Sequence, residues 1–133
     1  MLFIGVFPIM LLLIMVGTDA AVLFTHRRAL AAEADAAAIA GAQSADLEGL
    51  YTGGEPTSLP LDCAKARHVV AARIGSSSSD SRVTRAALGE VRCDGTSVSV
   101  ILRSQAVLPF ASELGVKPQV SVRADASARS PLR

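Results

Sequence analysis

The sequence predicts an α+β fold, in which a long N-terminal helix carries a small head of one helix and a three-stranded antiparallel sheet. Three observations predict it. Residues 1–17 carry no charged side chain, and an alanine-rich run follows soon after them. The stretch 63–74 has apolar side chains at spacings of three and four, as an amphipathic helix does. Alternating runs flank Asp94-Gly95 and recur over 119–128, as strands do.

The length of 133 residues allows about 50 for the helix and about 80 for one small domain. We predict four segments, which are a transmembrane or assembly helix (1–24), an alanine-rich helical stalk that continues it (25–49), a loop (50–61) and the head (62–133). A core of this size often needs a covalent link. Only 4% of residues are aromatic and the net charge is +1, which argues against a nucleic-acid partner.

The segment 1–24 is long and apolar enough to cross a bilayer. Pro8 lies within two turns of its start, where a proline kinks a helix or ends a frayed first turn. A cleaved signal peptide is the alternative, with a cleavage site at Thr18-Asp19-Ala20. We expect retention, because no Lys or Arg precedes the apolar run and the helical pattern continues beyond that site.

Asp19 lies near the far end of the predicted span. Either its carboxylate reaches water at the interface, or it pairs with a cation or an amine on a neighbouring helix. Arg27 and Arg28 would place the following residues in the cytoplasm. The two cysteines favour the opposite side, and we give them more weight. We therefore expect a single-pass protein of the cytoplasmic membrane with its C-terminal head outside the cytoplasm.

Residues 29–45 include ten alanines and no proline, so this run favours helix strongly. Small side chains allow helices to approach closely. They form two rows: Ala34, Ala38 and Ala42, and Ala37 with Gly41. The rows pack either on the chain's own head or on other subunits, and the sequence does not choose between these.

In the head, Asp62 is the expected N-cap of a helix, and Gly75 is expected just after its end, at the C′ position. Glycines and prolines mark the preceding residues as a loop. Four side chains share one face of this helix and are expected in the core: Cys63, Ala66, Val70 and Ile74. His68 stands apart from other ligand types and is interpreted as a surface residue.

Asp94-Gly95 predicts a two-residue hairpin turn. That turn pairs Cys93 with Thr96, Val91 with Val98, Gly89 with Val100 and Ala87 with Leu102. These pairs share one face, which is therefore apolar and faces the core. Pro109 ends the second strand, and a turn of helix is expected over 110–115. The third strand, over 119–128, turns alternate residues inward: Val120, Val122, Ala124 and Ala126.

Cys63 and Cys93 both point inward by these periodicities, one from the helix and one from the sheet. We expect a disulfide between them; two unlinked buried thiols in a reducing compartment are the alternative. The bridge would close a loop of about 30 residues, which is worth about 3–4 kcal/mol in the chain-entropy model.

The sequence lacks the motifs that carry chemistry. It has only two histidines, no nucleophile elbow, no phosphate-binding loop and no dinucleotide fingerprint. We expect no catalytic, metal or cofactor-binding residues, no cofactor and no enzymatic activity.

The order of several short segments resembles the TadE/TadG-like proteins of Flp (Tad-type) pilus assembly, particularly short actinobacterial forms. The N-terminal part of the resemblance is Pro8, the aliphatic run up to Gly17-Thr18-Asp19, His26-Arg27-Arg28-Ala29 and the run 34–40. In the head it includes Cys63, Cys93-Asp94-Gly95 and the run 120–124. It covers nearly the whole chain, although each piece is of low complexity.

The resemblance implies a pilin-like fold and a structural role, as a minor pilin-like subunit or an assembly or initiation component at the cell surface. Its partners would be membrane lipid, other pilin-like subunits and the Tad secretion machinery, in a hetero-oligomer joined through the N-terminal helix. The expected assembly residues on that helix are Pro8, Gly17, Asp19, Ala34, Ala37, Ala38, Gly41 and Ala42. The alternative is a membrane-tethered extracytoplasmic binding module that is unrelated to filament assembly.

Overall fold

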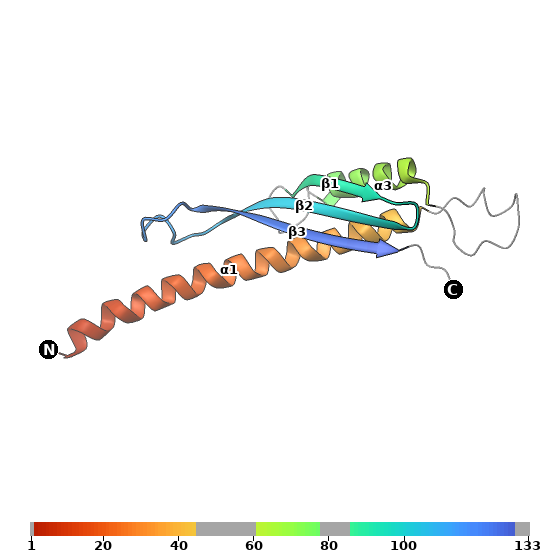
Figure 1. Cartoon of the computed structure of the whole chain (residues 1–133). Helices are drawn as coiled ribbons and strands as arrows, with labels where there is room; N and C mark the ends of the chain where they lie inside the picture. The colour runs from red at the N-terminus through yellow and green to blue at the C-terminus, as the bar shows by residue number, and fades with distance from the viewer. Residues whose placement is uncertain (1, 45–60, 78–85, 130–133) are drawn as a thin grey trace, which may run out of the picture.

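The computed structural model describes residues 2–44, 61–77 and 86–129. The elements are α1 (Leu2–Ala42), α3 (Cys63–Ser77), β1 (Ala87–Cys93), β2 (Ser97–Val107) and β3 (Gln119–Arg129). The strands form one antiparallel sheet in the order β1-β2-β3. α1 is a long rod, and the sheet lies along its C-terminal part (Figure 1). The predicted α+β fold is confirmed.

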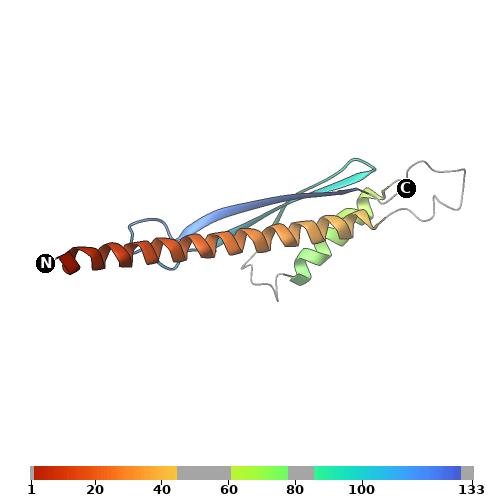
Figure 2. The same ribbon diagram turned by 90° about the horizontal axis from the view of Figure 1, so that it is seen from below.

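Both helices lie against the same face of the sheet, and α3 crosses α1 near the C-terminal end of the rod (Figure 2). Val98, Val100 and Leu102 of β2 are fully buried beneath them. The helices add further core residues: Leu30, Ala34, Ala37, Ala38, Ala66, Val70 and Ile74. The C-terminal half of α1 is therefore part of the core of the head.

α1 differs from the prediction at two places. It continues through Pro8, so this proline does not end a first turn. It was expected to reach residue 49 but ends at Ala42, where the backbone N–H and the hydroxyl of Ser44 both donate to the Gly41 carbonyl. These bonds satisfy a carbonyl that the helix end leaves without an intrahelical partner. Residues 45–49 and the predicted loop 50–60 lie outside the described residues.

α3 begins as predicted, because the Asp62 carboxylate accepts hydrogen bonds from the backbone N–H groups of Ala64 and Lys65, at 3.0 and 3.1 Å. The prediction for its end is wrong. Gly75 lies inside the helix, which continues to Ser77, and it does not have the positive φ of a C′ glycine. The sequence over 76–80, four serines and an aspartate, predicts a flexible connector, but Ser76 and Ser77 belong to the helix, and residues 78–80 are outside the described residues.

The hairpin register also differs from the prediction. Cys93 pairs with Val98 and Val91 with Val100, a shift of two residues. Gly95, with φ of 85°, takes a central turn position, and the Asp94 carboxylate accepts the Ser97 and Thr96 N–H groups at 2.7 and 3.1 Å. A shift of two keeps each side chain on its face, so the core residues of β2 are those predicted.

The start of β1 breaks the expected alternation. The pairing is irregular between Leu88 and Glu90, where Gly89 adds a residue to one strand. A bulge of this kind changes which side of the sheet the preceding residues occupy. Ala87, predicted to face the core, therefore pairs with Arg103 and is exposed.

β3 confirms the third predicted strand and ends one residue beyond it, at Arg129. Val122 and Ala124 are buried, whereas Ser121, Arg123 and Asp125 are exposed. Residues 108–118 connect β2 to β3 as a compact turn, in which Glu113 and Leu114 donate to the Phe110 carbonyl and Val116 donates to that of Ala111. The predicted turn of helix is present only as these turn bonds, without a helix.

Candidate membrane and assembly surface

The N-terminal part of α1 projects beyond the head with its apolar side chains exposed. Over residues 5–18, only Met15 is even half-buried. The exposed large side chains are Val6, Phe7, Ile9, Met10, Leu11, Leu12, Leu13, Ile14 and Val16. Lone apolar residues on a surface are normal, but a continuous apolar rod marks a membrane or protein contact. α1 is long and apolar enough, by length and composition, to cross a membrane.

Asp19 marks the point where the head first holds α1. Its side chain is only 8% exposed, and Oδ1 accepts a hydrogen bond from the backbone N–H of Phe110 at 3.1 Å. The prediction that the Asp19 carboxylate reaches water is therefore wrong. The alternative, a cation or an amine on a neighbouring helix, is not the partner either, because Asp19 accepts from a backbone amide of the chain's own head. Sequence periodicity gives no signal for a contact between residues 91 positions apart.

His26 makes a second polar contact two helical turns further on. Its Nε2 lies 3.1 Å from the Ser104 hydroxyl oxygen on β2. Residues seven apart lie on the same face of a helix, so Asp19 and His26 face the sheet together. Leu30, fully buried, continues that face. These contacts fix the position of the sheet along α1, and no motif in the sequence indicates this role for His26.

The two rows of small residues also face the head. Ala34, Ala37, Ala38 and Ala42 are at most 3% exposed. At Gly41, an added Cβ would lie 2.9 Å from Val70 Cγ2 and 3.2 Å from Val98 Cγ1. The small side chains thus let α1 approach α3 and β2 closely. Of the two interpretations, the structure supports packing on the chain's own head for this surface.

Pro8 and Gly17, the other expected assembly residues, lie on the projecting segment. A Cβ added to Gly17 would meet no other atom within 4 Å, so the helix surface there is open. Glycine lets another helix approach its backbone. The structure thus divides the predicted assembly residues into an open pair, Pro8 and Gly17, and a set that the head covers.

Cys63 and Cys93 form the expected disulfide, with their Cα atoms 5.7 Å apart. Cys63 opens α3 and Cys93 closes β1, so the bond joins the second helix to an edge strand of the sheet. Both cysteines are half-buried at the margin of the core.

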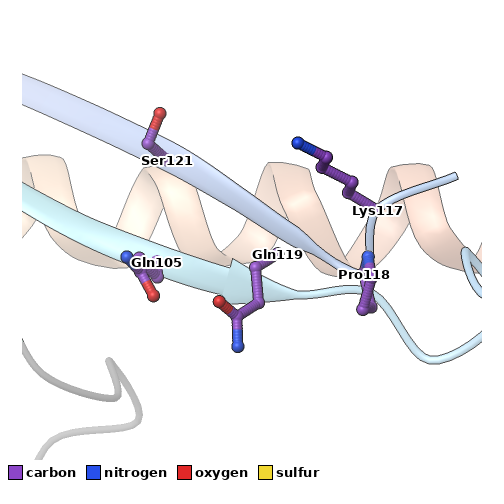
Figure 3. A pocket seen from close by; sticks show the side chains of 5 residues that line it. All are labelled: Gln105, Lys117, Pro118, Gln119 and Ser121. Carbon is purple, nitrogen blue, oxygen red and sulfur yellow. The ribbon is translucent and has the colours of Figure 1, made fainter.

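The outer face of the sheet is mostly polar, although Val107 is exposed on it. A shallow hollow of about 360 Å³ lies where β2 and β3 meet the turn between them, and Figure 3 shows the side chains that line it: Gln105, Lys117, Pro118, Gln119 and Ser121. Toward the other end, Arg92 Nε lies 2.6 Å from Glu90, and this hydrogen bond lowers the pKa of the Glu90 carboxyl. Within the described ranges, no three His, Cys, Asp or Glu side chains gather closely enough to hold a metal ion.

The Asp94 turn carries the largest resolved electrostatic effect. Hydrogen bonds from the Ser97 and Thr96 backbone amides lower the pKa of the Asp94 carboxyl to about 2. Such bonds favour the charged form of a carboxyl group. The side chain therefore stabilises the hairpin, and it has no features of a catalytic acid.

Comparison with known families gives a match for the N-terminal segment of the chain. Residues 1–44 match the model of the family described as "Putative Flp pilus-assembly TadE/G-like". The resemblance found in the sequence is thereby confirmed for this segment, which comprises the projecting part of α1 and the part packed in the head. Searches among curated proteins and among solved structures gave no match.

Proposed function

Starting from the TadE/G-like pilus-assembly domain at residues 1–44, we propose that this chain is a structural, non-enzymatic minor pilin-like subunit or assembly component of a Tad-type pilus. The projecting segment of α1, residues 5–18, is the surface by which it packs against other pilin-like subunits. The same segment holds the chain in the cytoplasmic membrane before assembly.

One observation carries this proposal: α1 changes environment at Asp19. Before that residue its side chains are apolar and exposed, and after it one face is covered by the head. Apolar surface of this extent is stable in a bilayer or against other helices, but not in water. Since the head already covers the alanine rows, the segment before Asp19 is the continuous apolar surface that α1 leaves open to other subunits.

The disulfide supports the proposed location of the head. Disulfides form and persist in oxidising compartments outside the cytoplasm. A Cys63–Cys93 bond therefore favours an extracytoplasmic head, although Arg27 and Arg28 follow the span.

A replacement of the projecting segment tests the proposal. Residues 5–18 are exchanged for an unrelated leucine-rich sequence of the same length, and Asp19 onward is unchanged. Membrane retention and the disulfide are expected to persist, whereas co-purification with the pilus machinery and the formation of pili are lost. Full piliation would contradict an assembly role and favour the alternative, a tethered extracytoplasmic binding module.

A pair of point variants sharpens the test. Gly17→Leu fills the open surface of the projecting segment, and Gly75→Leu makes the same change on α3; neither glycine has another atom within 4 Å of an added Cβ. Leucine favours membrane insertion, so anchoring should survive in both. We expect Gly17→Leu alone to reduce co-purification with pilus subunits. Equal effects of the two variants would contradict packing at Gly17.

A further inference from the structure

The sheet end nearest the N-terminus of α1 has a second apolar surface. The turn between β2 and β3 runs beside α1 toward its N-terminus (Figures 1 and 2). Leu114 and Val116 in this turn are 37% and 58% exposed. The hydrogen bond from the Phe110 N–H to Asp19 fixes the turn against the apolar helix. The head therefore presents apolar side chains at the level where the rod begins to project.

The charges of α1 indicate where a membrane surface would lie. After residue 5, the first exposed charged side chains of α1 are those of Arg27 and Arg28. Phe24, three residues before Arg27, is 67% exposed. Asp19 precedes Arg27 by eight residues, which is about 12 Å along a helix. The headgroup layer is only about 5–8 Å thick on each side of a bilayer. The turn lies beyond Asp19 toward the N-terminus of α1, so Arg27 is more than one headgroup layer away from it and stays on the water side when the turn reaches the headgroups.

In a hollow beside α1, charged and apolar side chains are also separated along the helix. The hollow has a volume of about 520 Å³ and lies between α1 and β3. Its apolar lining comes from Ala20, Leu23, Phe24, Val120 and Val122, and its charged lining from Arg27 and Arg123. Arg27 is the lining residue of α1 furthest from the N-terminus, and Arg123 is the lining residue of β3 furthest from the turn. The two arginines therefore lie at the head side of the hollow, and the apolar lining extends toward the rod.

We propose that the turn 108–118 rests in the headgroup layer of the bilayer, with Leu114 and Val116 at the boundary with the acyl chains and with Arg27 and Arg123 on the water side. Phospholipid thus covers the exposed side chains of Leu114 and Val116. This inference rests on the membrane anchoring in the proposed function and adds a second contact, made by the head itself.

The turn is built for such a position. Its backbone groups bond within the turn: the Val116 N–H donates to the Ala111 carbonyl, and the Leu108 N–H donates to the Pro118 carbonyl, both at 2.8 Å. Internal hydrogen bonds are required where water is scarce. Asp19 and the Phe110 N–H satisfy each other at the same depth. Glu113 and Lys117 are exposed and limit the depth, because ionised groups are costly among acyl chains. Leu114 and Val116 therefore lie at the boundary between headgroups and acyl chains.

Site-directed fluorescence tests this contact of the turn with lipid in the full chain. The disulfide leaves no free thiol among the described residues, so one introduced cysteine takes an environment-sensitive fluorophore. The label is placed by Val116→Cys in the turn, Leu12→Cys in the rod or Thr96→Cys at the opposite end of the sheet. The protein is reconstituted in vesicles of phosphatidylcholine and phosphatidylglycerol, with a nitroxide quencher on the acyl chain near the headgroup.

The label at Val116 is expected to lose fluorescence to the lipid quencher and to shift to the blue, as the Leu12 label does. The Thr96 label is expected to respond only to a quencher in water. If lipid quenches the Leu12 label but the Val116 label is exposed to water, the proposed contact of the turn with lipid is wrong. The membrane anchoring by α1 would still hold. A Leu12 label outside the lipid would overturn both. Leu114→Cys gives the same measurement if Val116→Cys does not fold.

Discussion

Gly41→Ala should destabilise the head, because α1 meets α3 and β2 at this residue without space for a methyl group. The new Cβ would lie 2.9 Å from Val70 and 3.2 Å from Val98. Both valines are fully buried, and the disulfide ties the helix of Val70 to β1, so neither side chain can withdraw easily. Overpacking costs about 1–3 kcal/mol, and we expect the upper part of that range.

Helix propensity acts in the opposite direction, because alanine is favoured over glycine by about 1 kcal/mol in a helix interior. The net destabilisation is therefore about 1–2 kcal/mol. For a domain of this size each kcal/mol lowers Tm by about 4–8 °C, so a decrease of about 4–16 °C is expected. Thermal unfolding of the oxidised full chain in detergent micelles, followed by circular dichroism, measures it.

Gly75→Ala is the matched control. It makes the same change in α3, at a position where the new Cβ meets no other atom within 4 Å. Only the gain in helix propensity remains, so Tm should stay the same or rise. If Gly41→Ala were as stable as Gly75→Ala, α1 could not be packed as closely as described, and the small residues would be open to other subunits.

Three further predictions concern the disulfide and the hydrogen bonds of two aspartates. Replacement of both Cys63 and Cys93 by serine should lower the free energy of unfolding by about 3–4 kcal/mol, measured against the oxidised wild type by denaturant titration. The pKa of Asp94 in the folded head, about 2, lies below its ordinary value of 3.8, so the carboxylate stabilises the fold above pH 3.8 and this contribution is lost as the pH falls through about 2. Asp94→Asn should remove that part of the acid dependence, and an unchanged acid profile would contradict it. Asp19→Leu should leave the Phe110 N–H without its acceptor, at a cost of about 1–3 kcal/mol, and should speed hydrogen exchange at that amide, whereas exchange at wild-type rates would contradict the bond.

Local patterns predicted the faces of the elements well. Spacings of three and four identified the buried side of α3, and alternation identified the buried sides of β2 and β3. The hairpin register was wrong by two residues, because the rule for Asp-Gly places both residues at the centre of the turn. Here the Asp94 side chain holds the amides that follow it, which moves the centre of the turn to Gly95 and Thr96. Such side-chain bonds are not visible in a periodicity.

The contacts that position the head on α1 could not be predicted in this way. One contact joins Asp19 to Phe110, 91 positions further along the chain. The other joins His26 to Ser104, 78 positions further along. Each pair depends on how far the sheet slides along the helix, and helical periodicity is compatible with many such positions. Once the helix and the sheet are placed, the same two pairs explain why a carboxylate and an imidazole occur on the buried face of this helix.

The position of the alanine rows changes how an assembly role can be tested. The sequence alone suggests leucine at Ala34, Ala38 or Gly41 as a way to disrupt subunit contacts. The structure shows that these residues pack against α3 and β2, so such leucines would disrupt the head itself, and a loss of pili would not separate folding from assembly. The alanine-rich composition is already explained by packing within the chain. Within the matched segment 1–44, the residues before Asp19 are therefore the place where a substitution tests assembly without disturbing the core.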